Sequence, residues 1–203
     1  MRDCPYKIVV VGTSLGGLNA LQVLLPSLPK RFPLPVAIVQ HRHKDSKDSL
    51  SDFLQGYCPL PLTEAEDKEA IIPGRVYLAP PDYHLLVEEG HFALSTEAAV
   101  CHARPSIDVL FESAADAYAQ GVIGVILTGA SHDGSQGLLS IQAQGGLALI
   151  EDPTTAQSPT MPTAALAALQ QQRISNTVVT AYWILPLRDI APFLVNLCHL
   201  ALR

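Results

Sequence analysis

A serine flanked by glycines follows the first apolar run of the chain. The run Ile8–Val11 leads directly into Gly12-Thr13-Ser14-Leu15-Gly16. Glycines two positions before and two positions after a serine let the chain turn sharply from a strand into a helix, which presents the hydroxyl at the sheet edge. The pattern therefore predicts that Ser14 is a nucleophile. A tight turn in which Ser14 only caps the following helix fits the same spacing.

A serine hydroxyl needs a base, and a third group that orients the base, before it reacts at neutral pH. His41 ends the next apolar run, and Asp133 lies in a loop after a later one. Neighbouring parallel strands lie about 5 Å apart, so we predict that Ser14, His41 and Asp133 meet at one sheet edge as a catalytic triad. The chain order Ser, His, Asp differs from the Ser, Asp, His order of ordinary α/β-hydrolases.

Other roles are open for the same residues. His132 could compete with His41 as the base, although a base adjacent in sequence to its orienting acid would be poorly placed. Asp133 could simply cap the helix that follows it. His41 and His43 could form a metal pair, but no second cluster has the spacing of zinc ligands, so we expect no metal.

The glycine-rich loop could instead bind a nucleotide phosphate. A dinucleotide-binding fold requires Gly-x-Gly-x-x-Gly after the first strand and an acidic residue at the end of the second. In this chain Ser14 replaces the second glycine, and Gln40-His41 stands where the acid should be. The loop also lacks the Gly-Lys-Ser/Thr of a P-loop. A nucleotide-dependent oxidoreductase is therefore disfavoured.

Strands and helices alternate in an order that would bring these loops together. Apolar runs predict strands at Lys7–Val11, Val36–Gln40, Arg75–Ala79, Gly121–Gly129 and Leu147–Ile150. Helices are predicted at Gly17–Leu28, at Asp45–Tyr57, after Ser106, after Gly134, at Thr163–Gln172 and at Leu187–Ala201. Tyr83–Leu94 is typical of a β-hairpin. We expect a doubly wound, mainly parallel α/β sheet flanked by helices, with an antiparallel hairpin appended and ligands at the carboxyl ends of the strands.

Composition limits the remaining possibilities. The chain has 203 residues, of which 48% are hydrophobic, and we expect one domain over residues 1–203. A net charge of −6 argues against a nucleic-acid partner. No apolar stretch is long enough for membrane insertion. The four cysteines form no CxxC pair and no secretory leader opens the chain, which favours a cytoplasmic location.

Six motifs, taken in order, resemble the catalytic domain of CheB-type chemotaxis protein-glutamate methylesterases. They are VVVGTSLGGLNAL, IVQH, IIPGRVYLAPPDYH, RPSIDVLFESAA, GVILTGASHDG and EDPTTAQSPTMPTAAL. The resemblance places Ser14, His41 and Asp133 on the nucleophile, the base and the orienting acid of the family. It implies hydrolysis of glutamate methyl esters on chemoreceptors with release of methanol, and in some members deamidation of receptor glutamines. No metal or organic cofactor is implied.

The resemblance also implies residues around the triad. The backbone N–H groups of Leu15 and Ala130 are expected to form an oxyanion hole, and Thr13, Arg104 and Met161 are expected near the substrate. The family usually has a small or hydroxylated residue at the position of Leu15 and a methionine at the position of Ala130. We expect these departures to reshape the pocket.

Many members of the family carry an N-terminal receiver domain. The first strand begins almost at once here, so we expect a catalytic domain without a receiver domain in this chain, either as a stand-alone enzyme or as a fragment of a larger protein. Its expected partners are a methylated chemoreceptor-like protein and a separate response regulator or signalling protein. The alternative is a non-catalytic relative that binds a receptor or signalling partner. The presence of Ser14, His41 and Asp133 together favours the enzyme, because a binding module needs none of them.

Overall fold

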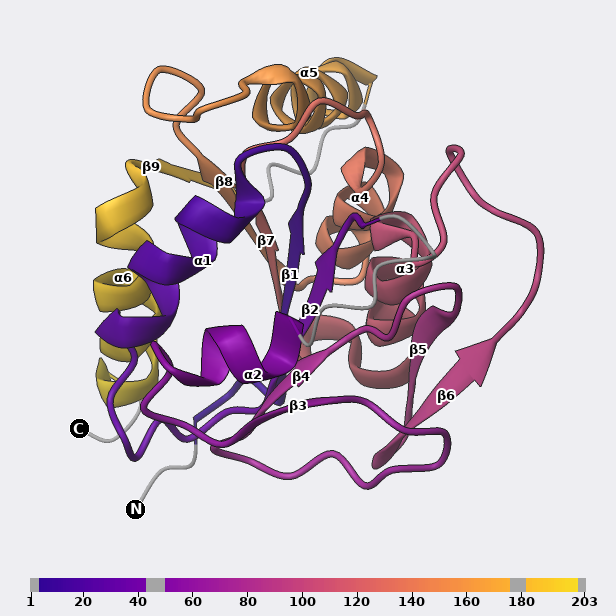
Figure 1. Ribbon diagram of the computed structural model, residues 1–203. Coiled ribbons are helices and arrows are strands. Elements are labelled where there is room, and N and C mark those ends of the chain that lie inside the picture. The colour runs from indigo at the N-terminus through magenta and orange to yellow at the C-terminus, as the bar shows by residue number, and fades with distance from the viewer. Residues whose placement is uncertain (1–3, 43–49, 176–181, 201–203) are drawn as a thin grey trace.

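Helices cover both faces of a central sheet, and a small second sheet lies beside it (Figure 1). The computed structural model describes residues 4–42, 50–175 and 182–200. The strands are β1 Ile8–Thr13, β2 Val36–Gln40, β3 Leu62–Glu64, β4 Val76–Leu78, β5 His84–Glu88, β6 His91–Ser95, β7 Val122–Ile126, β8 Leu147–Glu151 and β9 Tyr182–Leu185. The helices are α1 Gly17–Leu24, α2 Leu50–Gln55, α3 Ile107–Tyr118, α4 Ser135–Ala143, α5 Thr160–Ser175 and α6 Leu187–Leu200, with 3-10 turns at Leu25–Ser27 and Ala119–Gly121.

The central sheet has the strand order β3-β4-β2-β1-β7-β8-β9, and its neighbouring strands are parallel. From β1 the chain runs to β2 on one side and later reaches β7 on the other side, so the strand order reverses at β1. In open α/β sheets ligands bind at such a switch point, beyond the carboxyl ends of the strands. The predicted doubly wound α/β class is confirmed, and β5 and β6 form the predicted antiparallel hairpin.

The side chains of β1 divide the core into two layers. Val9 and Val11 pack in the layer that contains α1, α2 and α6, whereas Ile8 and Val10 pack in the layer that contains α3, α4 and α5. All residues of β1 are buried, because a central parallel strand is covered on both faces. This burial explains why its sequence is a continuous apolar run.

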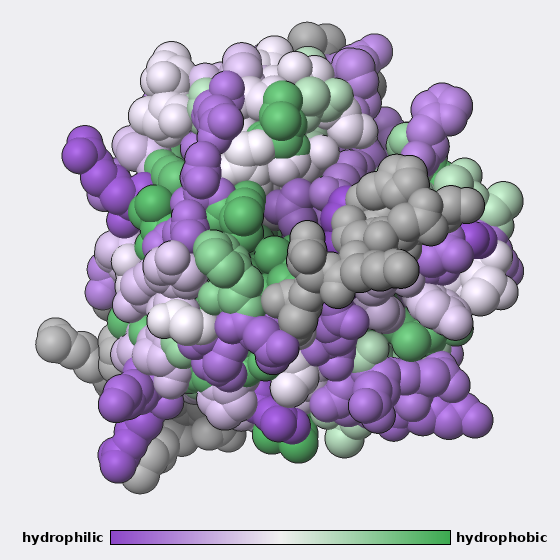
Figure 2. Space-filling view, in the orientation of Figure 1, coloured by the Kyte–Doolittle hydropathy of each residue, from purple (hydrophilic) through white to green (hydrophobic). Residues whose placement is uncertain are grey.

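Apolar side chains on the surface form small groups. The face drawn in Figure 2 is hydrophilic over most of its area, with hydrophobic residues between the polar ones. The most exposed large hydrophobic residue is Leu15, at 59%, among those described. None of the described helices has the length and apolar character needed to cross a membrane.

Several element boundaries differ from the prediction for local reasons. Helix α1 ends four residues earlier than predicted, because Pro26 follows it and the chain continues as a 3-10 turn. Of the helix predicted at Asp45–Tyr57, residues 45–49 lie outside the described residues, and α2 begins at Leu50 and ends at Gln55, two residues before the predicted end. The edge strands β3 and β9 have only 3 and 4 residues, so their sequences are too short to show a period.

Candidate active site

The ends of β1 and β2 place two of the predicted catalytic residues side by side. Ser14 follows β1 and His41 follows β2, and the two strands pair with Thr13 opposite Gln40. The pairing continues beyond the strands, because the His41 N–H donates to the Thr13 carbonyl at 3.0 Å. The Ser14 N–H donates to the carbonyl of Thr128, just after β7, also at 3.0 Å. Backbone hydrogen bonds therefore hold the three loops together.

His41 and Asp133 form a hydrogen-bonded pair. Nε2 of the imidazole lies 2.7 Å from Oδ2 of Asp133, and the imidazole is 15% exposed while the carboxylate is fully buried. Because Nε2 is engaged with the carboxylate, Nδ1 is the ring nitrogen left to exchange a proton with another group.

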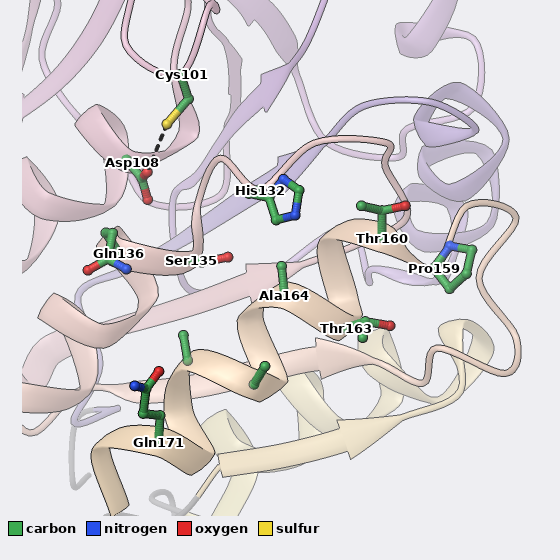
Figure 3. A pocket seen from close by; sticks show the side chains of 12 residues that line it. Cys101, Asp108, His132, Ser135, Gln136, Pro159, Thr160, Thr163, Ala164 and Gln171 are labelled. Atoms are coloured by element: carbon green, nitrogen blue, oxygen red, sulfur yellow. Dashed lines mark hydrogen bonds between the residues drawn. The ribbon is translucent and has the colours of Figure 1, made fainter. Parts of the chain in front are cut away.

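In the described chain no hydrogen bond or ion pair joins the imidazole of His132 to Asp133. The His132 side chain lines a groove of about 760 Å³ between α4 and α5, together with Thr160, Thr163 and Ala164 (Figure 3). The structure therefore favours His41 over His132 as the base that Asp133 orients.

Asp133 is held at the N-terminus of α3. Its carboxylate accepts hydrogen bonds from Ser106 Oγ at 2.8 Å, from the Ile107 N–H at 2.7 Å and from the Asp108 N–H at 2.9 Å. Burial raises the pKa of Asp133, but the hydrogen bonds from His41, from the two amides and from the Ser106 hydroxyl outweigh burial and lower the pKa overall. The carboxylate is therefore ionised near neutral pH. It caps α3 rather than the helix that follows it, whose N-cap is Gly134 with no side-chain cap.

The glycines around Ser14 have separate steric reasons. A Cβ at Gly12 would collide with Cγ2 of Ile107. Gly16 has a φ of +82° as the N-cap of α1, and a Cβ there would lie 2.8 Å from Oε1 of Gln157. Gly12 therefore allows Ile107 of α3 to pack closely against β1, and Gly16 allows the left-handed backbone at the start of α1.

Ser14 and His41 line one open pocket of about 470 Å³. Its other walls are Leu15, Gly16, Leu18, Asn19, Gln40 and Gln157. Among the described residues, the Ser14 hydroxyl has no hydrogen-bond partner, and no hydrogen bond joins it to the imidazole. Such contacts are often long before substrate binds and tighten in the complex. The structure thus shows the His41–Asp133 contact and the shared pocket, and not a formed Ser14–His41 contact.

Thr128 ties the loop after β7 to the nucleophile loop. Its carbonyl accepts from the Thr13 hydroxyl at 2.9 Å as well as from the Ser14 N–H, and its own hydroxyl donates to the Leu15 carbonyl at 3.0 Å. The Thr128 N–H donates to the buried carboxyl of Glu151 at 2.8 Å, and burial raises the pKa of that carboxyl. Within the described chain, the N–H groups of Leu15 and Ala130 donate to no acceptor.

Two of the residues expected near the substrate lie below the surface instead. The side chain of Thr13 is fully buried and bonded to Thr128. Met161 is 1% exposed and packs against the backbone of Gly129, where a Cβ would collide with its sulfur. Neither side chain lines the pocket of Ser14 in this structure, and direct contact of either with substrate stays a prediction.

Arg104 lies beside the site but is already bonded. Its guanidinium contacts Asp82 Oδ1 at 2.6 Å and donates to the carbonyls of Thr96 and Glu97 at 2.8 and 3.0 Å. It also lines a second cavity, of about 600 Å³, that reaches His41.

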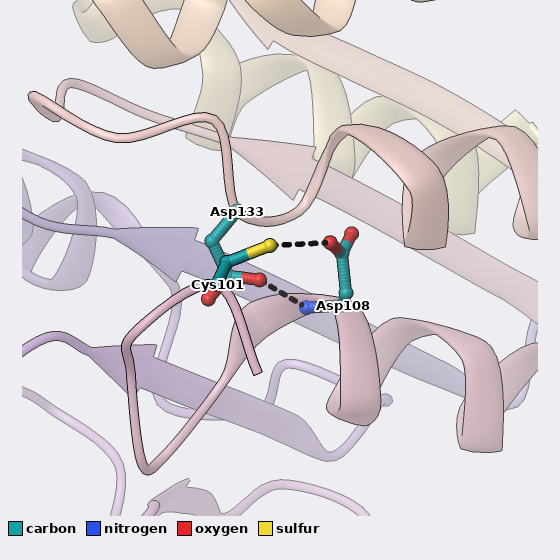
Figure 4. A group of neighbouring side chains, drawn as sticks. All are labelled: Cys101, Asp108 and Asp133. Atoms are coloured by element: carbon teal, nitrogen blue, oxygen red, sulfur yellow. Dashed lines mark hydrogen bonds between the residues drawn. The ribbon is translucent and has the colours of Figure 1, made fainter. Parts of the chain in front are cut away.

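A cluster of Cys101, Asp108 and Asp133 offers ligand atoms within 4.8 Å of one another (Figure 4). Both carboxylates of the cluster already accept hydrogen bonds. Asp133 accepts those from α3 and Ser106, and Asp108 Oδ1 accepts the Gly137 N–H at 2.7 Å. The Cys101 thiol lies 3.9 Å from the other oxygen of Asp108. Burial, followed by the charges of the nearby carboxylates, raises the pKa of the thiol, so the thiolate that a metal requires is disfavoured.

Gln40, Ser106 and Thr128 are parts of the site that the sequence analysis does not assign. The side-chain amide of Gln40 donates to the backbone carbonyls of both Ser14 and His41. The position of Gln40, directly before the predicted base at a strand end, is a signal that could have found it. Ser106 and Thr128 act through contacts distant in sequence, which no local pattern shows.

The fold and this site define a doubly wound α/β protein with a serine, a histidine and an aspartate gathered at the carboxyl edge of its sheet. The CheB methylesterase family profile matches residues 9–192. The chain belongs to this family.

Individual relatives agree with the family assignment. A protein of Leptospira interrogans is 48% identical over 164 residues, which are 80% of this chain and 85% of that protein. A protein-glutamate methylesterase/protein-glutamine glutaminase of Thermotoga maritima is 36% identical over 180 residues, and the match spans 51% of its length. The crystal structure of the Thermotoga maritima CheB methylesterase catalytic domain superposes with a TM-score of 0.83 at 34% identity, and the match covers 95% of this chain and 98% of that one.

Proposed function

We propose that the protein is a serine hydrolase that removes methyl esters from glutamate side chains of a chemoreceptor-type protein, giving glutamate and methanol in the cytoplasm. The observation that carries the proposal is the 2.7 Å contact between His41 and Asp133 beside the pocket that Ser14 lines. The family assignment and the name of the Thermotoga maritima relative support the substrate class.

Acylation follows from the arrangement of the three side chains. The Ser14 hydroxyl attacks the ester carbonyl while Nδ1 of His41 takes its proton. Asp133, held ionised by its hydrogen bonds, keeps the other imidazole proton on Nε2 and stabilises the imidazolium. The imidazolium then returns a proton to the leaving methoxide, so methanol departs and an acyl-enzyme remains.

Deacylation repeats the steps with water. His41 takes a proton from a water molecule that attacks the acyl-enzyme, and then protonates the Ser14 oxygen as the glutamate carboxylate leaves. The free N–H groups of Leu15 and Ala130 are the proposed donors to the negatively charged oxygen of both tetrahedral intermediates. The hydrogen bonds of Thr128 to both sides of the nucleophile loop support this role, because they fix Leu15 next to the loop that carries Ala130.

Glutamine deamidation is a second proposed activity. The same acyl-enzyme forms from a glutamine side chain when ammonia leaves in place of methanol. The Thermotoga maritima relative carries this activity in its name. A separate response regulator or signalling protein is proposed to control access to the pocket.

The experiment that tests the proposal is methanol release from a methylated chemoreceptor fragment, compared with Ser14→Ala. The wild-type protein is expected to release methanol, and Ser14→Ala is expected to lose nearly all activity while its melting temperature stays within a few degrees. Equal activity of the two proteins would exclude Ser14 as the nucleophile. An inactive wild-type protein that still binds the fragment would favour the alternative, a non-catalytic binding module.

A further inference from the structure

The side-chain amide of Gln40 joins the backbones of the proposed nucleophile and base. Its Nε2 donates to the Ser14 carbonyl at 3.0 Å and to the His41 carbonyl at 2.8 Å. Gln40 is the last residue of β2 and is 8% exposed. A single NH₂ group, with both of its protons used, therefore spans the two loops from which the Ser14 and His41 side chains project.

The orientation of the amide follows from its neighbours. Both carbonyls are acceptors, so only the NH₂ end of the amide can face them. The amide oxygen then points toward Gly17, where a Cβ would collide with it, and the oxygen has no hydrogen-bond partner among the described residues. An unpaired buried oxygen opposes folding. The orientation that makes the two contacts to Ser14 and His41 therefore leaves the amide oxygen unpaired and leaves no room for a Cβ at position 17.

These contacts bear directly on the reaction. No side-chain hydrogen bond joins Ser14 to His41 in the described structure, so the backbone sets the separation of the hydroxyl and the imidazole. On the basis of the proposed function, we propose that Gln40 is a positioning residue that locks the Ser14 peptide to the His41 peptide for proton transfer. A displacement of about 1 Å between reacting groups lowers a rate by roughly 100-fold.

The matched test compares Gln40→Met with Gln55→Met. Gln55 makes the same type of bridge far from the pocket, because its Nε2 donates to the carbonyls of Cys58 and Leu60, each at 3.0 Å. Methionine keeps the length of either side chain and removes both donors; at Gln55 it also removes Oε1, which accepts the Leu62 N–H at 2.8 Å. The measurements are the rate of covalent labelling of Ser14 by a fluorophosphonate, kcat and KM for methanol release, and the melting temperature.

Gln40→Met is expected to slow labelling and to lower kcat by about 10- to 100-fold with KM within about twofold, by the same geometric argument. Gln55→Met is expected to keep the wild-type labelling rate and kcat, even if its melting temperature falls as much as that of Gln40→Met. Gly17→Ala, whose Cβ would collide with the Gln40 amide oxygen and also with the Thr13 side chain, is expected to lower both rates as well. A Gln40→Met protein with wild-type labelling rate and kcat would overturn the inference, as would an equal loss in Gln55→Met.

The labelling and methanol-release measurements together distinguish failure of the proposed function from failure of the proposed role of Gln40. Wild-type protein that takes up the label but releases no methanol would refute the substrate class, and the labelling rates would still decide the role of Gln40. Wild-type protein that neither takes up the label nor releases methanol would overturn both proposals.

Discussion

The carboxylate of Asp133, which precedes α4, accepts a hydrogen bond from the first turn of α3, and the carboxylate of Asp108 in α3 accepts one from the first turn of α4. Asp133, two residues before α4, accepts the Asp108 N–H of α3 at 2.9 Å (Figure 4). Asp108 accepts the Gly137 N–H of α4 at 2.7 Å. Carboxylates are favourable at helix N-termini, where free N–H groups and the helix dipole meet. The carboxylate that contacts His41 therefore lies at the junction of two helices. We expect a change at either aspartate to affect both the stability of the protein and the proposed reaction.

Replacing Asp133 by asparagine should separate capping from proton transfer. The amide oxygen of the introduced asparagine can still accept the Asp108 N–H and the Ser106 hydroxyl in place of Oδ1. Its NH₂ would then replace Oδ2 and face both Nε2 of His41 and the Ile107 N–H. The contact with His41 favours the tautomer with the proton on Nδ1, which cannot act as the base. We expect kcat to fall by about 10³- to 10⁴-fold, as for the equivalent change in serine proteases.

The measurements for Asp133→Asn are kcat, KM and the melting temperature. Ser106→Ala is the control, because it removes one donor to the same carboxylate and leaves the contact to His41 in place. A kcat of Asp133→Asn within tenfold of wild type would rule out the proposed role of Asp133.

Asp108 should make stability fall as the pH rises. Burial, and to a smaller extent the charge of Asp133, raises the pKa of Asp108 from 3.8 to about 6. The folded state then binds more protons than the unfolded state between about pH 4 and 6, so the free energy of unfolding falls with pH in this window. A shift of about two units corresponds to at most about 3 kcal/mol.

Urea unfolding of wild type and Asp108→Asn over this pH range tests that shift. Asparagine keeps an acceptor for the Gly137 N–H but cannot ionise. Wild type should lose stability relative to Asp108→Asn as the pH rises from about 4 to 6, and the difference should be constant above that range. A difference that does not change with pH would show that Asp108 is not perturbed.

The main framework of the site could be predicted because it depends on strand ends. In a parallel sheet, the residue that follows each strand lies at the same edge, so the positions of Ser14 and His41 in the sequence suffice to bring them together. The glycine spacing around Ser14 predicts the turn for the same local reason. His41 and Asp133 are 92 positions apart in sequence, yet the order of strands places them within hydrogen-bond distance.

The surroundings of the site could not be predicted in the same way. The capping of α3 by Asp133 depends on how α3 packs against α4, and a local pattern assigns the aspartate to the next helix instead. Thr13 and Met161 stand close to Ser14 in the fold, but only the three-dimensional structure shows that both are buried beneath the pocket.

Alanine at Gly16 and at Gly90 should separate backbone strain from damage to the pocket. Both glycines have positive φ, +82° and +86°, so alanine should cost about 1 kcal/mol of stability at each. Only at Gly16 would the new Cβ meet a neighbour, because it lies 2.8 Å from Oε1 of Gln157, whereas nothing lies within 4 Å at Gly90. Gly16→Ala should therefore lose activity and Gly90→Ala should keep it, as measured by methanol release and fluorophosphonate labelling. Equal activities would show that the contact with Gln157 does not shape the pocket.

The position of Arg104 beside the site suggests that it binds substrate, whereas its hydrogen bonds suggest a structural role. A guanidinium free to bind substrate would lower KM, whereas the observed guanidinium is occupied by Asp82 and two loop carbonyls. We therefore expect Arg104→Met to lose about 1 kcal/mol of stability, since the ion pair is partly exposed, and to change KM by less than about threefold. Asp82→Asn is the matched variant, because it weakens the same ion pair and leaves Arg104 in place. Similar losses of stability in both variants, with little change in KM, would support a structural role. A large rise in KM for Arg104→Met alone, at unchanged melting temperature, would show instead that the guanidinium leaves Asp82 to bind the substrate.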